Sequence, residues 1–100
     1  MITRFRTFDL AVDFYKECKK LKIKSRVIRD QFERASLSIV TNLAEGKGRF
    51  GTNDQKKFFQ IAYGSLKETQ AIILILDEKD LYEKSDVIGA HIYKLIQNTK

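Results

Sequence analysis

The stretch FFQIAYGSLKETQAIILIL, residues 58–76, carries two apolar stripes at helical spacing. The first stripe recurs at every third or fourth residue, as apolar positions do in a coiled coil. Its members are Phe59, Ala62, Leu66, Thr69, Ile73 and Leu76. A second stripe, on another face, comprises Phe58, Ile61, Ser65, Ile72 and Ile75. A helix with two apolar faces needs two partners, so we expect a bundle to cover one face and a subunit to cover the other.

Three further segments have helical periodicity, and no segment sustains the alternation typical of a strand. The predicted helices span about residues 8–21, 26–45, 53–79 and 86–99. The predicted N-terminal caps are Thr7, Ser25, a capping box TNDQ at residues 52–55, and Ser85. Since each periodic segment is helical, the sequence predicts an all-α fold. Short connections between helices favour antiparallel neighbours. We expect one domain over residues 1–100, an up-down antiparallel four-helix bundle that is oligomeric.

Composition limits the class of protein and its compartment. The 100 residues carry a net charge of +6 and a single cysteine, Cys18, which cannot form an intrachain disulfide and fits a reducing cytoplasm. The longest apolar run, residues 71–76, is too short to span a bilayer. The first ten residues lack the apolar segment of a secretory signal. We therefore expect a cytoplasmic protein with no membrane partner.

The positive charge is unevenly distributed along the chain. Residues 1–57 hold 14 Lys and Arg against 7 Asp and Glu, whereas residues 58–100 hold 5 against 6. A basic surface attracts nucleic acid or another polyanion. The candidates form a first basic group, Lys19, Lys20, Lys22, Lys24, Arg26 and Arg29, and a second basic group, Lys47, Arg49, Lys56 and Lys57. The alternative is a charged surface that only keeps the protein soluble.

The segment GKGRFG, residues 46–51, spells G-x-G-x-x-G. A dinucleotide-binding loop of this pattern follows a strand, whereas helical periodicity precedes this one, and the G-K-[ST] of a Walker A loop is missing. We interpret the segment as the turn between the second and third helices. Gly46 is then the left-handed residue that ends the second helix, and Gly48 and Gly51 let the chain reverse.

A polar stripe runs along the second helix and comprises Gln31, Arg34, Ser38, Asn42 and Glu45. If Ser38 faces Ser65, the register places Arg34 near Glu68 and Ile39 near Gly64. A glycine inside a helix costs about 1 kcal/mol relative to alanine, so we expect close helix packing at Gly64 to offset it. The stripe then predicts an internal network, with Arg34 bound to Glu68 and Asn42 bound to Glu45.

No set of residues converges on catalysis. Glu45 and Glu68 lie several helical turns apart in this register, which is too far for an acid–base pair. Cys18 falls on an apolar stripe, and the only histidine, His91, lies near the other end of the sequence. One cysteine and one histidine give no metal-ligand spacing. We expect no enzymatic activity, no cofactor and no metal.

Two segments resemble a known family. QFERASLSIVTNLAEGKGR, residues 31–49, and KFFQIAYGSLKETQ, residues 57–70, resemble the bacterial four-helix-bundle proteins first named for intervening sequences of the 23S rRNA gene. The shared positions of the first segment are Arg34, Ala35, Ser38, Ile39, Asn42, Ala44, Glu45, Gly46, Gly48 and Arg49. Those of the second are Phe58, Ala62, Gly64, Ser65, Leu66 and Glu68. FDLAVDFYKE, residues 8–17, is similar to the family's first helix, while Val40 and Leu43 depart mildly from its pattern.

The resemblance implies an up-down four-helix bundle without enzymatic activity that forms homo-pentamers. A more distant relative, the accessory protein of diversity-generating retroelements, is pentameric and binds nucleic acid and a reverse transcriptase through a basic surface. The implied partners are therefore further copies of the chain, RNA or DNA, and a reverse transcriptase or other protein. The alternative is a protein-interaction scaffold without nucleic-acid contact.

Overall fold

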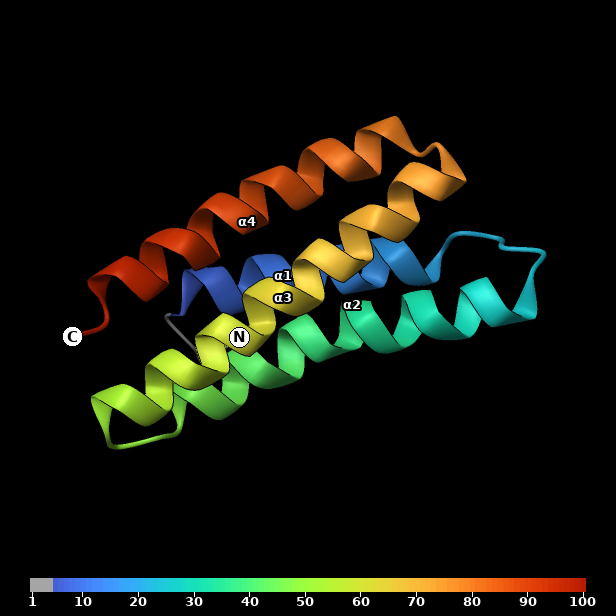
Figure 1. The fold of residues 1–100 in the computed structure, drawn as a ribbon. Coiled ribbons are helices and arrows are strands. Elements are labelled where there is room, and N and C mark those ends of the chain that lie inside the picture. The colour runs from blue at the N-terminus through green and yellow to red at the C-terminus, as the bar shows by residue number, and fades with distance from the viewer. Residues whose placement is uncertain (1–4) are drawn as a thin grey trace.

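The computed structural model describes residues 5–100 and consists of four helices (Figure 1). They are α1 (Arg6–Lys19), α2 (Arg26–Lys47), α3 (Thr52–Leu76) and α4 (Lys79–Asn98). The described chain contains no strand, so the all-α prediction is confirmed. The first four residues, part of the stretch in which we expect no secretory signal, lie outside the described range.

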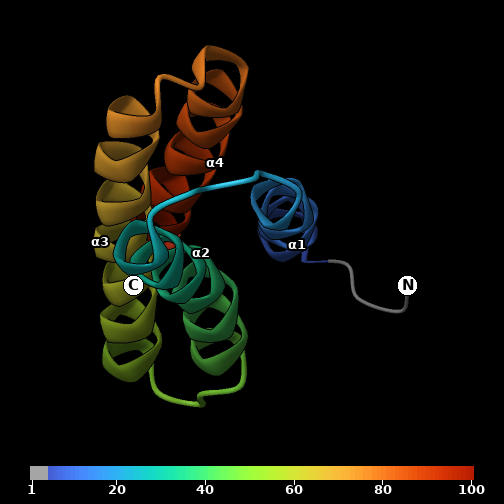
Figure 2. The same cartoon turned by 90° about the vertical axis from the view of Figure 1, so that its right-hand side faces the viewer.

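Each helix packs against two others in an elongated molecule of 42 × 24 × 20 Å. Helices α2 and α3 share the most extensive contact, and α1 and α4 the least extensive. Between residues 5 and 100, the backbones of α1 and α3 do not approach closely, and neither do those of α2 and α4. Figure 2 accordingly shows α1 and α3 on opposite sides of the molecule. The core between the helices includes Phe14, Phe32, Ile39, Leu66 and Ile92, each at most 3% exposed.

The sequence predicts the N-terminal cap of α2 correctly but not that of α1. Ser25 caps α2 as predicted, because its side chain accepts a hydrogen bond of 3.2 Å from the amide of Ile28. The prediction that Thr7 caps α1 is wrong. Helix α1 begins two residues earlier than predicted, at Arg6, after Phe5. Thr7 therefore lies inside the first turn and is turned toward the core, with 8% of its surface exposed.

Gly46 is not the left-handed residue that ends α2. Helix α2 continues to Lys47, and its C-terminal cap is Gly48 in a right-handed conformation (φ −82°, ψ −6°). None of the described glycines has a positive φ. Gly46 is instead buried against α3, where a Cβ atom would lie 2.6 Å from Cε1 of Phe59. The reason for glycine here is steric: α2 and α3 approach closely at their shared turn.

The predicted N-terminal caps of α3 and α4 are also wrong. Gly51, not Thr52, occupies the cap position of α3, and no side chain caps that helix, so the capping box is wrong. Helix α3 ends at Leu76, and Asp77 follows in the left-handed conformation at φ 57°. Helix α4 begins at Lys79, so the predicted cap Ser85 lies inside the helix and is fully buried.

The close approach predicted at Gly64 is found at other glycines. A Cβ atom on Gly64 would meet nothing within 4 Å, and the residue is exposed. In contrast, a Cβ atom on Gly89 of α4 would lie 2.8 Å from Cδ2 of Leu66 on α3. Helices α3 and α4 thus approach at Gly89, while α2 and α3 approach at Gly46. The helix cost of Gly64, about 1 kcal/mol, has no offsetting contact within the described chain.

Candidate functional site

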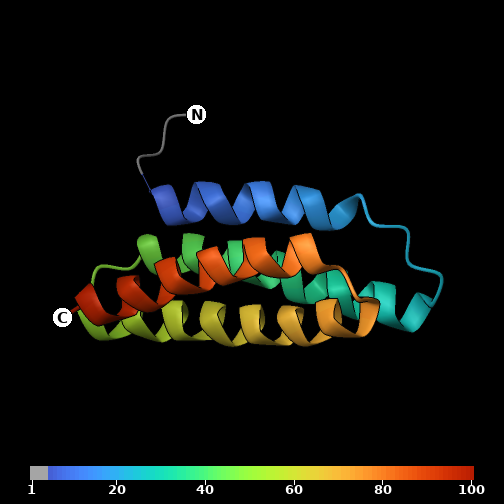
Figure 3. The ribbon, with the colours of Figure 1, turned by 90° about the horizontal axis from the view of Figure 1, so that it is seen from above.

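The two basic groups lie at opposite ends of the molecule (Figures 1 and 3). The first surrounds the connection between α1 and α2, residues 20–25, and the second surrounds the connection between α2 and α3, residues 48–51. All ten side chains are exposed except Lys56, which is half-buried. A single subunit therefore presents two separate basic ends rather than one continuous patch.

Acidic neighbours partly neutralise the first basic group. Three cations form ion pairs on exposed surface: Lys19 with Glu33 at 3.5 Å, Lys20 with Glu17 at 3.4 Å, and Arg26 with Asp30 at 3.8 Å. Pairs of this length on an exposed surface contribute little and are easily exchanged for another anion. Lys22 and Lys24 form no ion pair with the described residues. Arg29 donates from Nη1 to the carbonyl oxygen of Ile23 at 3.2 Å, which holds its guanidinium beside the connection.

Aromatic rings hold two cations of the second basic group. The Lys47 ammonium lies 5.3 Å from the centre of the Phe5 ring, and the Arg49 guanidinium lies 4.7 Å from that of Phe58. Arg49 also donates from Nη2 to Oε2 of Glu45 at 2.6 Å. Lys56 and Lys57 form no ion pair with any part of the chain that the structure describes. Lys47, Lys56 and Lys57 thus lack a carboxylate partner within residues 5–100.

A shallow hollow of about 400 Å³ lies beside the second basic group. Its lining consists of Glu45, Gly48, Arg49, Phe50, Gly51 and Asp54. Phe50 projects from the connection with its whole side chain exposed, at 105% of the reference area. A ring that no other residue covers offers a face on which an unpaired base can stack. The carboxylates of Glu45 and Asp54 at the same place oppose a phosphate, so the site is mixed in charge.

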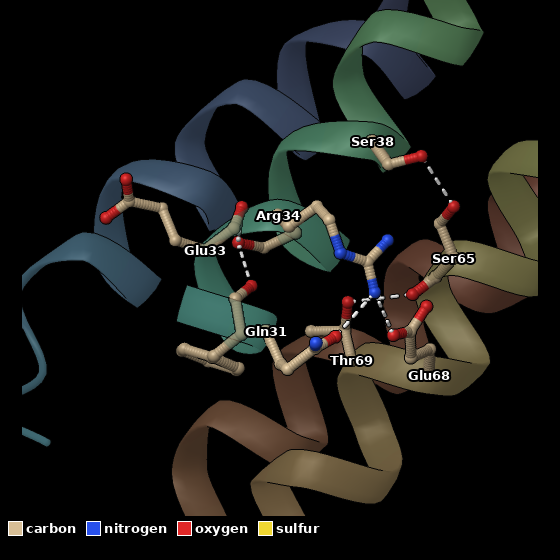
Figure 4. Close-up of polar contacts among 9 residues, drawn as sticks. Gln31, Glu33, Arg34, Ser38, Ser65, Glu68 and Thr69 are labelled. Atoms are coloured by element: carbon tan, nitrogen blue, oxygen red, sulfur yellow. Dashed lines mark hydrogen bonds and ion pairs between the residues drawn. The ribbon is translucent and has the colours of Figure 1, made fainter. Parts of the chain in front are cut away.

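The polar stripe of α2 meets α3 as the predicted register requires (Figure 4). The hydroxyls of Ser38 and Ser65 are 2.7 Å apart. Arg34 donates from Nη2 to Oε2 of Glu68 and to Oε1 of Gln31, both at 2.6 Å. The predicted pairs Ser38–Ser65 and Arg34–Glu68 are therefore confirmed.

Two details of this network differ from the prediction. The Arg34 and Glu68 side chains are 59% and 41% exposed, so this pair lies on the surface and is not internal. Asn42 does not bind Glu45. It donates from Nδ2 to the carbonyl and hydroxyl oxygens of Ser38, one turn earlier in α2, at 2.9 and 3.0 Å. Glu45 instead pairs with Arg49, which lies four residues further on, in the connection directly after α2.

The periodicity does not reveal a second polar cluster, which joins α3 to α4. Gln70 is 4% exposed and donates from Nε2 to Ser85 and to Oδ1 of Asp86, both at 2.9 Å. Ser85 in turn donates to the carbonyl oxygen of Tyr82. The buried amide of Gln70 requires such partners. The prediction of Ser85 as a cap misses this role, because serine is a residue typical of N-terminal caps.

A hollow of about 510 Å³ lies between α1 and α4, and its apolar lining includes Leu10, Phe14 and Ile88. An ion pair at its edge joins the two helices, with Lys84 Nζ 2.6 Å from Oε1 of Glu17. The hydrogen bond from Lys84 and its charge lower the pKa of Glu17, and the same bond raises the pKa of Lys84. Both side chains are solvent-exposed in part, so the pair orients the two helices more than it stabilises them.

The candidate catalytic residues do not come together. Cys18 is 3% exposed, and burial raises the pKa of its thiol to about 12, which disfavours the reactive thiolate. Glu45 and Glu68 are bound to different arginines. Residues 5–100 contain no group of three or more His, Cys, Asp or Glu side chains placed to hold a metal ion. Within the same range, no helix is long and apolar enough to cross a membrane.

Comparison with known proteins identifies the family. Comparison with curated proteins gives no match. The family model described as 23S rRNA-intervening sequence protein matches residues 3–99. Since this match covers nearly the whole chain and the structure has the four helices that the resemblance implies, the chain belongs to the family of 23S rRNA-intervening sequence proteins.

Proposed function

We propose that the protein is a non-enzymatic, cytoplasmic up-down bundle that self-associates, as a pentamer, and binds RNA or DNA through its basic ends. The observation that carries the proposal is the placement of the cations at the two ends of the molecule. Charges that are exposed and not neutralised release counterions from phosphates, which is the main source of affinity without sequence preference.

The second basic group is the primary site of the proposal. Lys47, Lys56 and Lys57 have no carboxylate partner in the described chain, and Phe50 is fully exposed in the connection that this group surrounds. Phosphates would contact the cations while an unpaired base stacks on Phe50. In a ring of identical subunits each site would recur, so weak contacts would combine by avidity. We expect micromolar or tighter binding with little sequence preference, since no base-reading motif is present.

The alternative is a protein-interaction scaffold, with a reverse transcriptase or another protein as partner and no nucleic-acid contact. The hollow between α1 and α4 favours this alternative, because both apolar and charged side chains line it. Apolar pockets with a few polar groups are typical of sites for ligands or protein segments. The two functions can be separated by measuring nucleic-acid binding directly.

Fluorescence anisotropy with a labelled structured RNA and a labelled DNA tests the proposal. The change of Lys47, Arg49, Lys56 and Lys57 to glutamine should weaken binding and flatten its dependence on salt. The matched control changes Lys19, Lys20, Lys22 and Lys24 to glutamine, which removes the same charge from the other end. Thermal melting followed by circular dichroism checks that both variants fold.

Each outcome decides between the alternatives. If the parent binds neither probe at about 50 mM salt, where phosphate contacts are strong, the scaffold function is favoured. If the first variant binds as the parent does and the control variant does not, the site lies at the first basic group. Equal losses in both variants would show that total charge, and not either end, determines binding.

A further inference from the structure

Helix α3 carries a stripe of exposed residues with the spacing of a coiled-coil seam. The members of this outer stripe are Lys57, Ile61, Gly64, Glu68, Ala71 and Ile75, which are spaced 4, 3, 4, 3 and 4 residues apart. All six are exposed, and Ile61 and Ile75 leave 42% and 69% of their surface uncovered. Positions with this spacing form one line along a helix, which another helix can follow at a shallow angle.

Gly64 lies near the middle of the outer stripe and has no role within the subunit. Its helical conformation is open to any residue, and a Cβ atom there would meet nothing within 4 Å. The other two glycines inside helices, Gly46 and Gly89, each have a neighbour that excludes a side chain. A glycine on a helix surface lets a second backbone approach closely. Gly64 is thus explained by a helix that the single subunit does not contain.

An apolar hollow of about 320 Å³ adjoins one end of the outer stripe, between α2 and α3. Its lining comprises Val27, Ile28, Gln31, Glu68, Ala71, Ile72 and Ile75. Val27, which is part of this lining, is 73% exposed. Exposed branched side chains around a hollow are the usual signature of a contact with another protein surface.

The charges on this face favour a protein and not a nucleic acid. Arg34 and Glu68 hold one positive and one negative charge side by side at the centre of the face. Arg34 makes both of its hydrogen bonds through Nη2, so Nε and Nη1 make no hydrogen bond with the described residues. A partly exposed guanidinium with donors to spare can bind a second carboxylate. A phosphate backbone would meet Glu68 here, whereas the cations that suit it lie at the ends.

We infer that the outer stripe is the surface on which a helix of a second copy of this chain docks, with Arg34 bonding a carboxylate of that copy. This inference rests on the self-association proposed above and identifies its surface. The occupant is a second copy because the outer stripe has the same seam spacing as the covered stripe of α3 and because Arg34 and Glu68, side by side on this face, make it complementary in charge to a second copy of itself. Docking covers Ile61 and Ile75 and brings a backbone against Gly64.

Size exclusion coupled to light scattering tests the inference at micromolar protein. Gly64→Leu and Ile75→Lys should each lower the mass from several times 11.7 kDa to about 11.7 kDa. Gly64→Leu fills only open space in the subunit, so its circular dichroism should remain helical. The matched control is Val87→Lys, at a residue that is 54% exposed beside the hollow between α1 and α4. It should retain the mass of the parent.

The failure of this inference differs from the failure of the proposed function. A parent protein that is monomeric would overturn self-association itself and, with it, the docking surface. A parent that assembles while Gly64→Leu and Ile75→Lys assemble equally well overturns only the docking surface. Loss of assembly in Val87→Lys alone places the interface at the hollow between α1 and α4. If Gly64→Leu unfolds, Ile75→Lys, which changes a side chain 69% exposed, still decides the question.

Discussion

Helix α3 presents one stripe to the core and another, with similar spacing, to the surface. The inner stripe, Phe59, Ala62, Leu66, Thr69 and Ile73, is at most 2% exposed. The outer stripe is exposed at every position. The second apolar stripe predicted from the sequence is divided between these environments. Ile72 is buried, Phe58 and Ser65 are half-buried, and Ile61 and Ile75 remain uncovered.

The comparison shows that spacing identifies a seam but not its partner. Both stripes have positions three and four apart, which suit a facing helix. Helices α2 and α4 cover the inner stripe, because each of them contacts α3. The described chain has no further helix for the outer stripe. The difference between the stripes therefore separates residues that maintain the subunit from residues available to a partner.

The largest expected effect is in the inner stripe. Leu66→Ala should lower the free energy of unfolding by about 2–5 kcal/mol, because it leaves a cavity at a fully buried position. Ile61→Ala in the outer stripe should change it by about 0.5 kcal/mol or less. Urea unfolding in the Ile75→Lys background measures both without a contribution from assembly. Comparable losses at the two positions would contradict the distinction between the stripes.

The glycine that faces the inner stripe should be the next most sensitive position. Gly46→Ala should destabilise the subunit by about 1–3 kcal/mol, since its Cβ atom would lie 2.6 Å from the Phe59 ring. Gly48→Ala is the control, because its Cβ atom would make ordinary contacts of 3.7 Å. Thermal melting should show a lower Tm for the first variant alone. A stabilised Gly46→Ala variant would mean that the ring moves aside freely.

The glycine of the outer stripe should respond with the opposite sign. Gly64→Ala should stabilise the isolated subunit by up to about 1 kcal/mol, because alanine is the better helix former and nothing obstructs it. The measurement is again urea unfolding in the Ile75→Lys background. Destabilisation there would reveal a close contact within the subunit at Gly64 and would remove the main argument for docking.

The smallest expected effect concerns the ion pair beside the outer stripe. A double-mutant cycle of Arg34→Ala and Glu68→Ala in the Ile75→Lys background should give a coupling energy of about 0.2–1 kcal/mol, because both side chains are substantially exposed. The coupling should fall as salt is added. A coupling of several kcal/mol, insensitive to salt, would restore the internal network that the sequence predicts.

The polar pairing shows how far local patterns reach. The spacing of Arg34 and Ser38 on one helix and of Ser65 and Glu68 on the next predicts their pairing, which the structure confirms. Whether the pair is buried depends on what lies over it, which no spacing contains. Asn42 likewise has two possible partners along its own helix, and it donates to the carbonyl oxygen of Ser38 and not to Glu45.

The sequence by itself determined four helices, the inner stripe and the register of α2 against α3, because apolar periodicity and short connections are local properties. The tertiary structure decided the rest. It assigned tight packing to Gly46 and Gly89 instead of Gly64, buried Ser85 inside α4 and left the outer stripe uncovered. These outcomes depend on which helices approach and how closely, and that follows from packing the whole chain at once.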